Sequence, residues 1–111
     1  MKKILFYVMG GETMCVQHVF LNALDLKDNG HEAKIIFEGQ SVKLPPELDG
    51  KNKLYDRCRD ENLIAGVCKA CSQQLGTLEQ NEALGLTMLS DMSGHAGMLP
   101  FINDGYEVIE F

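Results

Sequence analysis

The sequence predicts a small α/β domain in which parallel strands form a sheet between two layers of helices, a three-layer α/β/α sandwich. Short apolar runs of strand length alternate along the chain with segments of helical periodicity. The first runs show no polar alternation, which is typical of strands buried on both faces. Because parallel neighbours need crossover connections, the intervening helices favour a parallel sheet. The chain has 111 residues, so we expect one domain over 1–111.

The first half of the chain predicts a strand, a helix and a second strand. Residues 3–9 form a nearly continuous apolar run, expected to be a buried strand. Residues 13–28 carry apolar side chains at helical spacing, and Asn29-Gly30 is a typical helix stop. Residues 31–38 form a second apolar run. We expect a loop over 39–49, because this segment contains two adjacent prolines.

The second half predicts shorter elements. In order, these are a helix over 53–62, a strand over 63–67, a helix from Thr77 to Gly85, a short strand or connector over 86–90, a partly helical segment over 93–104 and a final strand over 106–111. Thr77, with Gln80 three residues later, fits a capping box at the start of its helix.

Composition and charge exclude several classes of partner. Apolar residues make up 45% and charged residues 23%, close to the average soluble domain. The net charge of −6, without a Lys/Arg cluster, argues against nucleic acids and against anionic membrane surfaces. No apolar run has membrane-spanning length. The first apolar run is short for a signal peptide and lacks a cleavage site, so we expect a cytoplasmic protein with reduced cysteines.

The pair Cys68 and Cys71 is the main candidate for chemistry. Cys68 follows the third apolar run, and the carboxyl ends of parallel strands are where open α/β sheets bind ligands. At a helix N-terminus the pKa of this thiol would be lowered, which favours a reactive thiolate. A buried, inert cysteine is an equally frequent outcome. Cys71 would share a helix face with Cys68 and is either a resolving thiol or a packing residue.

Other sites have weaker signals. One Cys-x-x-Cys supplies two of the four ligands that zinc usually requires, and no second pair exists, so we expect no metal and no cofactor. Phosphate-binding glycine motifs are absent. His95, between two glycines, is a candidate acid/base group or thiolate partner. Cys15 and Cys58 fall within helical segments and are expected to pack.

Three segments carry a resemblance to a known family. The segment Asn29–Val42, the cysteine segment Ile64–Cys71 with Gly76 and Glu79 behind it, and the closing segment Gly105–Phe111 resemble those of DsrE/DsrF-like sulfur-relay proteins, including the TusD-like members. These segments occur in the family's order and spacing over nearly the whole chain. Two features depart from the relay subunits. Gln73-Gln74-Leu75 replaces the basic residues that often follow the cysteine, and Cys71 stands where those subunits have no thiol.

The resemblance implies a five-stranded parallel sheet and a homo-oligomer, either a trimer or a hexamer. It also implies that Cys68 accepts sulfane sulfur as a persulfide and passes it from a donor protein to an acceptor protein. The role of Cys71, a resolving thiol or a packing residue, stays open. Two alternatives remain open from the residues themselves. One is a non-catalytic oligomeric binding or regulatory module, and the other is soft-metal binding through Cys68, Cys71 and His95.

Overall fold

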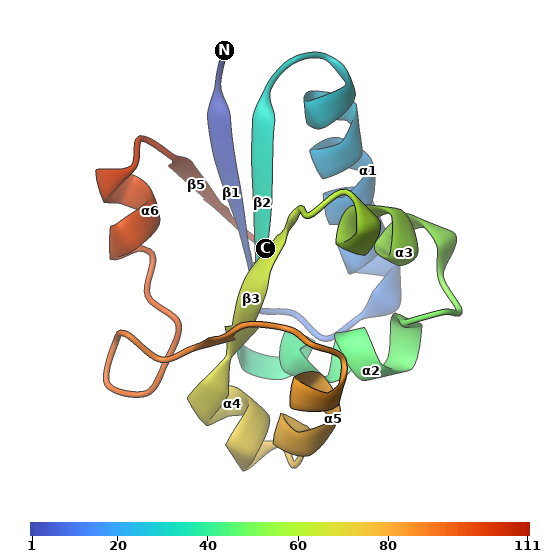
Figure 1. Cartoon of the computed structure of the whole chain (residues 1–111), viewed down its shortest axis with the longest axis vertical. Coiled ribbons are helices and arrows are strands. Elements are labelled where there is room, and N and C mark those ends of the chain that lie inside the picture. The colour runs from blue at the N-terminus through green and yellow to red at the C-terminus, as the bar shows by residue number, and fades with distance from the viewer.

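A computed structural model of the chain describes all 111 residues and contains one five-stranded, all-parallel sheet (Figure 1). The strand order is β4-β3-β2-β1-β5. The predicted α/β class and the parallel sheet are thereby confirmed. The strands are β1 (Lys3–Val8), β2 (Glu32–Phe37), β3 (Ile64–Cys68), β4 (Met88–Leu89) and β5 (Glu107–Glu110).

Helices cover both faces of the sheet, as predicted. The chain passes from β1 to β2 and then to β3, each time to the neighbouring strand on the same side. Because such crossovers are right-handed, the helices that connect these strands lie on one face of the sheet. The chain then returns from β4 to the far side of β1, which places α6 on the opposite face (Figure 1). The helices are α1 (Thr13–Asp28), α2 (Leu44–Leu48), α3 (Lys53–Asp60), α4 (Lys69–Gln74), α5 (Leu78–Ala83) and α6 (Leu99–Asn103), with a 3₁₀ helix at Gly39–Lys43.

The core lies between the sheet and the α1–α3 layer. β1 and β2 run in register from Lys3 opposite Glu32 to Val8 opposite Phe37. Aromatic rings of α1, β2 and α3 pack at its centre, with centroids 5.9–6.4 Å apart: Phe20, Phe37 and Tyr55. None of the helices combines the length and the apolar character needed to cross a membrane.

The predicted loop over residues 39–49 was wrong, because this segment forms the 3₁₀ helix and α2. The two prolines lie in the first turn of α2, where the backbone N–H groups have no partner within the helix and proline is tolerated. Val42, Leu44 and Leu48 are buried, so tertiary packing stabilises the segment.

The predicted capping box at Thr77 was also wrong in its chemistry. Thr77 is the N-cap of α5, but its side chain makes no capping hydrogen bond. Its hydroxyl oxygen instead lies 3.4 Å from the amide nitrogen of buried Asn81, which also donates to Val42 O at 3.0 Å and to Ser72 Oγ at 3.2 Å. Asn81 therefore ties α5 to the segment that follows β2 and to α4.

Candidate functional site

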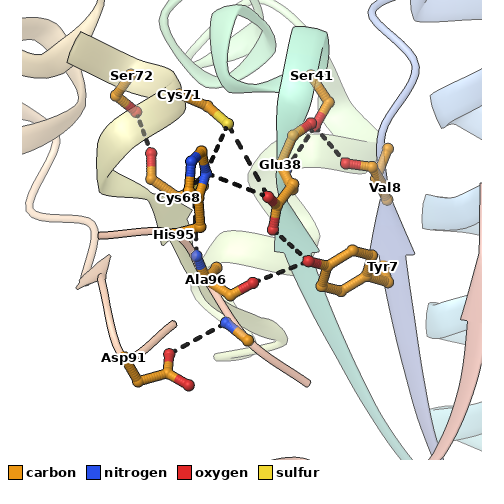
Figure 2. Close-up of polar contacts among 11 residues, drawn as sticks. Tyr7, Val8, Glu38, Ser41, Cys68, Cys71, Ser72, Asp91, His95 and Ala96 are labelled. Carbon is orange, nitrogen blue, oxygen red and sulfur yellow. Dashed lines mark hydrogen bonds and ion pairs between the residues drawn. The ribbon is translucent and has the colours of Figure 1, made fainter. Parts of the chain in front are cut away.

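Four side chains meet at the carboxyl edge of the sheet: Glu38, Cys68, Cys71 and His95 (Figure 2). Each offers one ligand atom, and these atoms all lie within 4.8 Å of one another. Glu38 follows β2, Cys68 ends β3, Cys71 lies in α4, and His95 comes from the loop after β4. The structure thus brings together all three candidate residues of the sequence analysis and adds a carboxyl group.

Cys68 is fully buried beneath this edge. Its Sγ lies 3.3 Å from Nδ1 of His95 and accepts a hydrogen bond from the backbone N–H of Ala96 at 3.4 Å. Burial raises the pKa of the Cys68 thiol to about 11, although hydrogen bonds from the Cys71 and Ala96 backbones oppose the rise. The expectation of a lowered pKa was wrong, because α4 is short and desolvation outweighs its dipole.

Cys71 lies one turn further along α4, on the same side of the helix as Cys68. Its Sγ is 3.5 Å from Nδ1 of His95 and 3.9 Å from Oε1 of Glu38. The helix is held behind the site by the Ser72 hydroxyl, which donates to the carbonyl oxygen of Cys68 at 2.8 Å. The two thiols are therefore neighbours on a fixed backbone.

A tight hairpin turn carries His95 into the site. Met92 and His95 exchange two backbone hydrogen bonds of 2.9 Å, and the intervening Ser93 and Gly94 have φ of 51° and 90°. Positive φ at both central residues matches the two-residue turns that join antiparallel segments. The Gly94 carbonyl accepts a 2.9 Å bond from the N–H of Ala70, which fixes the turn against α4. The His95 side chain remains 37% exposed.

Glu38 is the site residue that the sequence analysis missed. It is buried, and its Oε1 lies 3.7 Å from Nδ1 of His95. Its Oε2 accepts a hydrogen bond from the hydroxyl of Tyr7, which also lies 2.8 Å from the carbonyl oxygen of Ala96. Ser41 accepts a 2.9 Å bond from the Glu38 N–H. The sequence does contain a signal for Glu38, which is an acidic residue at the end of the second apolar run. The strand formed by that run, β2, pairs with β3, which ends in Cys68.

The other cysteines lie outside the site. Cys58 is buried as expected, and burial raises its pKa to about 12. Cys15 was expected to pack, but it is exposed at the start of α1. It lies beside an apolar pocket of about 180 Å³ that Val16, Val19 and Phe111 also line. The two remaining histidines are also elsewhere, and His31 accepts a 2.8 Å bond from the backbone N–H of Lys2.

The arrangement can support two kinds of chemistry. A thiol beside an imidazole nitrogen is a nucleophile paired with a base. Two thiols, one imidazole and one carboxyl group are also a set of ligands for a transition metal. Both kinds of chemistry use Cys68, which contacts His95 directly.

Comparison with known proteins yields relatives without an assigned activity. The chain is 29% identical over 99 residues to an uncharacterized protein of Methanocaldococcus jannaschii, with 86% of this chain and 78% of the relative covered. It is 36% identical over 44 residues to an uncharacterized protein of Archaeoglobus fulgidus, with 40% of this chain and 72% of that protein covered. No family model matches the chain. No solved structure matches it either.

Proposed function

Since the chain belongs to the same family as the uncharacterized protein of Archaeoglobus fulgidus, whose name assigns no activity, we propose its function from its own site. We propose that it is a cytoplasmic sulfur carrier of the DsrE/DsrF-like kind, which holds sulfane sulfur as a persulfide on Cys68. The proposed partners are a sulfur-donor protein and a sulfur-acceptor protein.

The contact between Cys68 and His95 is the single observation that carries this proposal. Nδ1 of His95 lies 3.3 Å from the Cys68 Sγ, within reach for accepting its proton. A nucleophile beside a base is the usual way to activate a thiol whose own pKa is too high. His95 is also the only partly exposed member of the four, so a donor would reach Cys68 by displacing this ring.

The proposed transfer balances as a thiol–persulfide exchange. The Cys68 sulfur attacks the outer sulfur of a donor persulfide, and a new S–S bond forms on Cys68. The S–S bond of the donor breaks, and the donor leaves as a thiol. His95 takes the proton of Cys68 and returns a proton to the departing thiolate. No oxidant is consumed, because the sulfane sulfur moves between thiols without a net redox change.

We propose that Cys71 can resolve the persulfide. Both sulfurs lie within 4.8 Å of each other, and both face Nδ1 of His95. The Cys71 thiolate would attack Sγ of Cys68, forming a Cys68–Cys71 disulfide and releasing the outer sulfur as hydrogen sulfide. This step would discharge sulfur when no acceptor is present.

A second candidate is a non-catalytic binding or regulatory module. The complete burial of Cys68 favours it, because a thiol without exposed surface is usually inert. The two candidates differ in one observable property, which is whether Cys68 takes up sulfur.

The test is sulfur loading of the full chain with a small-molecule persulfide donor, followed by mass spectrometry of the intact protein and its peptides. The wild-type chain should gain one sulfur atom on the peptide that contains Cys68, and Cys68→Ser should gain none. Cys15→Ser is the matched control, since it removes an exposed thiol outside the site. Equal loading of Cys68→Ser, or no loading of the wild type, would reject the sulfur-carrier proposal.

A further inference from the structure

We propose that Glu38, Cys68, Cys71 and His95 bind one divalent transition-metal ion of the zinc type, with tetrahedral coordination. This inference goes beyond sulfur transfer and does not depend on it. The sequence analysis disfavoured a metal because the cysteine pair supplied two ligands. The fold supplies the other two, from segments far apart in the chain (Figure 2).

The distances between the four side chains fit tetrahedral coordination. Nδ1 of His95 faces Sγ of Cys68, Sγ of Cys71 and Oε1 of Glu38 at 3.3, 3.5 and 3.7 Å. With zinc bonds of about 2.3 Å to sulfur and about 2.1 Å to nitrogen and oxygen, tetrahedral ligands lie about 3.4–3.8 Å apart. The edge from Cys71 Sγ to Glu38 Oε1 is 3.9 Å. The other two edges, from Cys68 to Cys71 and from Cys68 to Glu38, are no longer than 4.8 Å. Four of the six edges therefore match tetrahedral coordination within a few tenths of an ångström, and an ion would draw Cys68 toward the other ligands where the last two edges are longer.

The charges around Glu38 give an independent reason for a cation. Glu38 is buried, yet no lysine or arginine forms an ion pair with it. The other ion pairs of the molecule involve lysines and arginines away from the site: Lys2, Lys3, Lys27, Arg57 and Arg59. The group within ion-pair distance of Glu38 is His95, whose Nδ1 lies 3.7 Å from Oε1 and carries a charge only when protonated. A buried carboxylate without a permanent cation is costly, and the two thiols would add negative charge when they lose their protons to a metal. A divalent cation would compensate these charges.

The ligands are also held in place by neighbouring groups. The Tyr7 hydroxyl bonds the oxygen of Glu38 that does not face His95, which orients the carboxyl group toward the cluster. The backbone N–H of Ala96 bonds the Cys68 sulfur. Such outer groups orient metal ligands in known sites. The segments that supply the ligands are connected by backbone and side-chain hydrogen bonds, so the site is largely formed before an ion binds.

The donor set selects the kind of metal. Magnesium and calcium bind thiolate ligands poorly, because they prefer oxygen ligands. A site with a carboxylate and an imidazole beside two thiolates suits zinc better than copper(I), which prefers sulfur ligands. Four protein ligands leave no open position, which is typical of a structural or regulatory ion and not of a hydrolytic one. A bound ion and a persulfide would both occupy Cys68, so the two states exclude each other.

The test is titration of the metal-free full chain with Co²⁺ and Zn²⁺ under anaerobic conditions. Co²⁺ should bind in a one-to-one ratio with the intense visible absorption of a tetrahedral site and with thiolate-to-cobalt charge transfer, and Zn²⁺ should displace it. Cys68→Ser and Cys71→Ser should weaken binding by more than the roughly 10–100-fold loss typical of an outer-shell group. Glu38→Gln should change the cobalt spectrum, and Cys15→Ser should leave it unchanged.

An octahedral cobalt spectrum, or a spectrum that Cys68→Ser leaves unchanged, would overturn the metal site. Circular dichroism of each variant shows that the loss of binding is not a loss of fold. Sulfur loading is measured separately on metal-free protein, so the two proposals can fail independently. Metal binding without sulfur uptake would reject the carrier alone, and sulfur uptake without tetrahedral cobalt would reject the metal site alone.

Discussion

Cys68 shows how strongly burial controls the chemistry of one thiol. It ends a strand at the edge where reactive groups are expected, yet it has no exposed surface. The resulting rise in its pKa keeps the thiol protonated at neutral pH. Any reaction of Cys68 therefore needs a base at hand, and His95 is the group in contact with it.

The cysteines of the metal-free protein should differ in alkylation by iodoacetamide. At neutral pH, exposed Cys15 should react first, and buried Cys58 and Cys68 should react more slowly. The pKa values of Cys58 and Cys68 are raised to about 12 and about 11, so their thiolate fractions and alkylation rates should increase as the pH rises toward those values. Peptide mass spectrometry measures each site, and neutral alkylation of Cys68 as fast as that of Cys15 would contradict the structure.

His95→Ala should distinguish two effects of His95 on Cys68, which are covering the thiol from solvent and accepting its proton. Removal of the partly exposed ring should uncover Cys68 and increase its alkylation. It should also slow sulfur loading, by about 10²–10⁴-fold for the loss of a general base. His18→Ala is the matched control, because His18 lies in α1 away from the cluster. If alkylation and sulfur loading rise together in His95→Ala, His95 acts only as a cover.

At the scale of elements, the strands and the helices α1, α3 and α5 could be predicted from the sequence, while the 3₁₀ helix, α2 and the full site could not. The pattern of α1 predicted its bounds, since the helix is long and its buried side chains repeat at helical spacing. The two prolines of the segment after β2 predicted a loop, but burial of Val42, Leu44 and Leu48 stabilises helical structure there. Glu38 was missed because its role depends on which strands are neighbours, and strand order is not a local property.

The contact of β3 with β4 gives a prediction for one glycine. A Cβ at Gly66 would lie 2.6 Å from the carbonyl oxygen of Thr87 and 2.7 Å from the Leu89 side chain. Gly66→Ala should therefore lower the free energy of unfolding by about 1–3 kcal/mol, as overpacking usually does. Gly10→Ala is the control, because a Cβ there meets nothing within 4 Å. Denaturant unfolding measures both, and equal midpoints would contradict the close strand packing.

At the scale of the whole molecule, one exposed apolar side chain on β5 is compatible with the expected homo-oligomer. β5 is an edge strand, and Ile109 on it is 44% exposed. An unpaired edge with an exposed apolar side chain can associate with another chain, although the exposed Glu107 and Glu110 on the same strand oppose close pairing. The trimer or hexamer comes from the family resemblance and remains a prediction.

Sedimentation velocity should find a trimer or hexamer, and Ile109→Lys should shift the protein toward smaller species. The matched control is Leu21→Lys, which places a charge on the side of α1 near Leu54, away from β5. A wild-type monomer at all concentrations would contradict the proposed oligomer. Equal dissociation of both variants would contradict the role of β5.

Sulfur uptake and metal binding are both assigned to one site, centred on Cys68. The decisive measurement is native mass spectrometry of full chains exposed in parallel to a persulfide donor and to Zn²⁺. The wild-type chain should gain one sulfur atom or one zinc ion, prior loading with one should block the other, and Cys68→Ser should gain neither. Equal uptake by Cys68→Ser, or simultaneous uptake of sulfur and zinc by a single chain, would contradict this assignment.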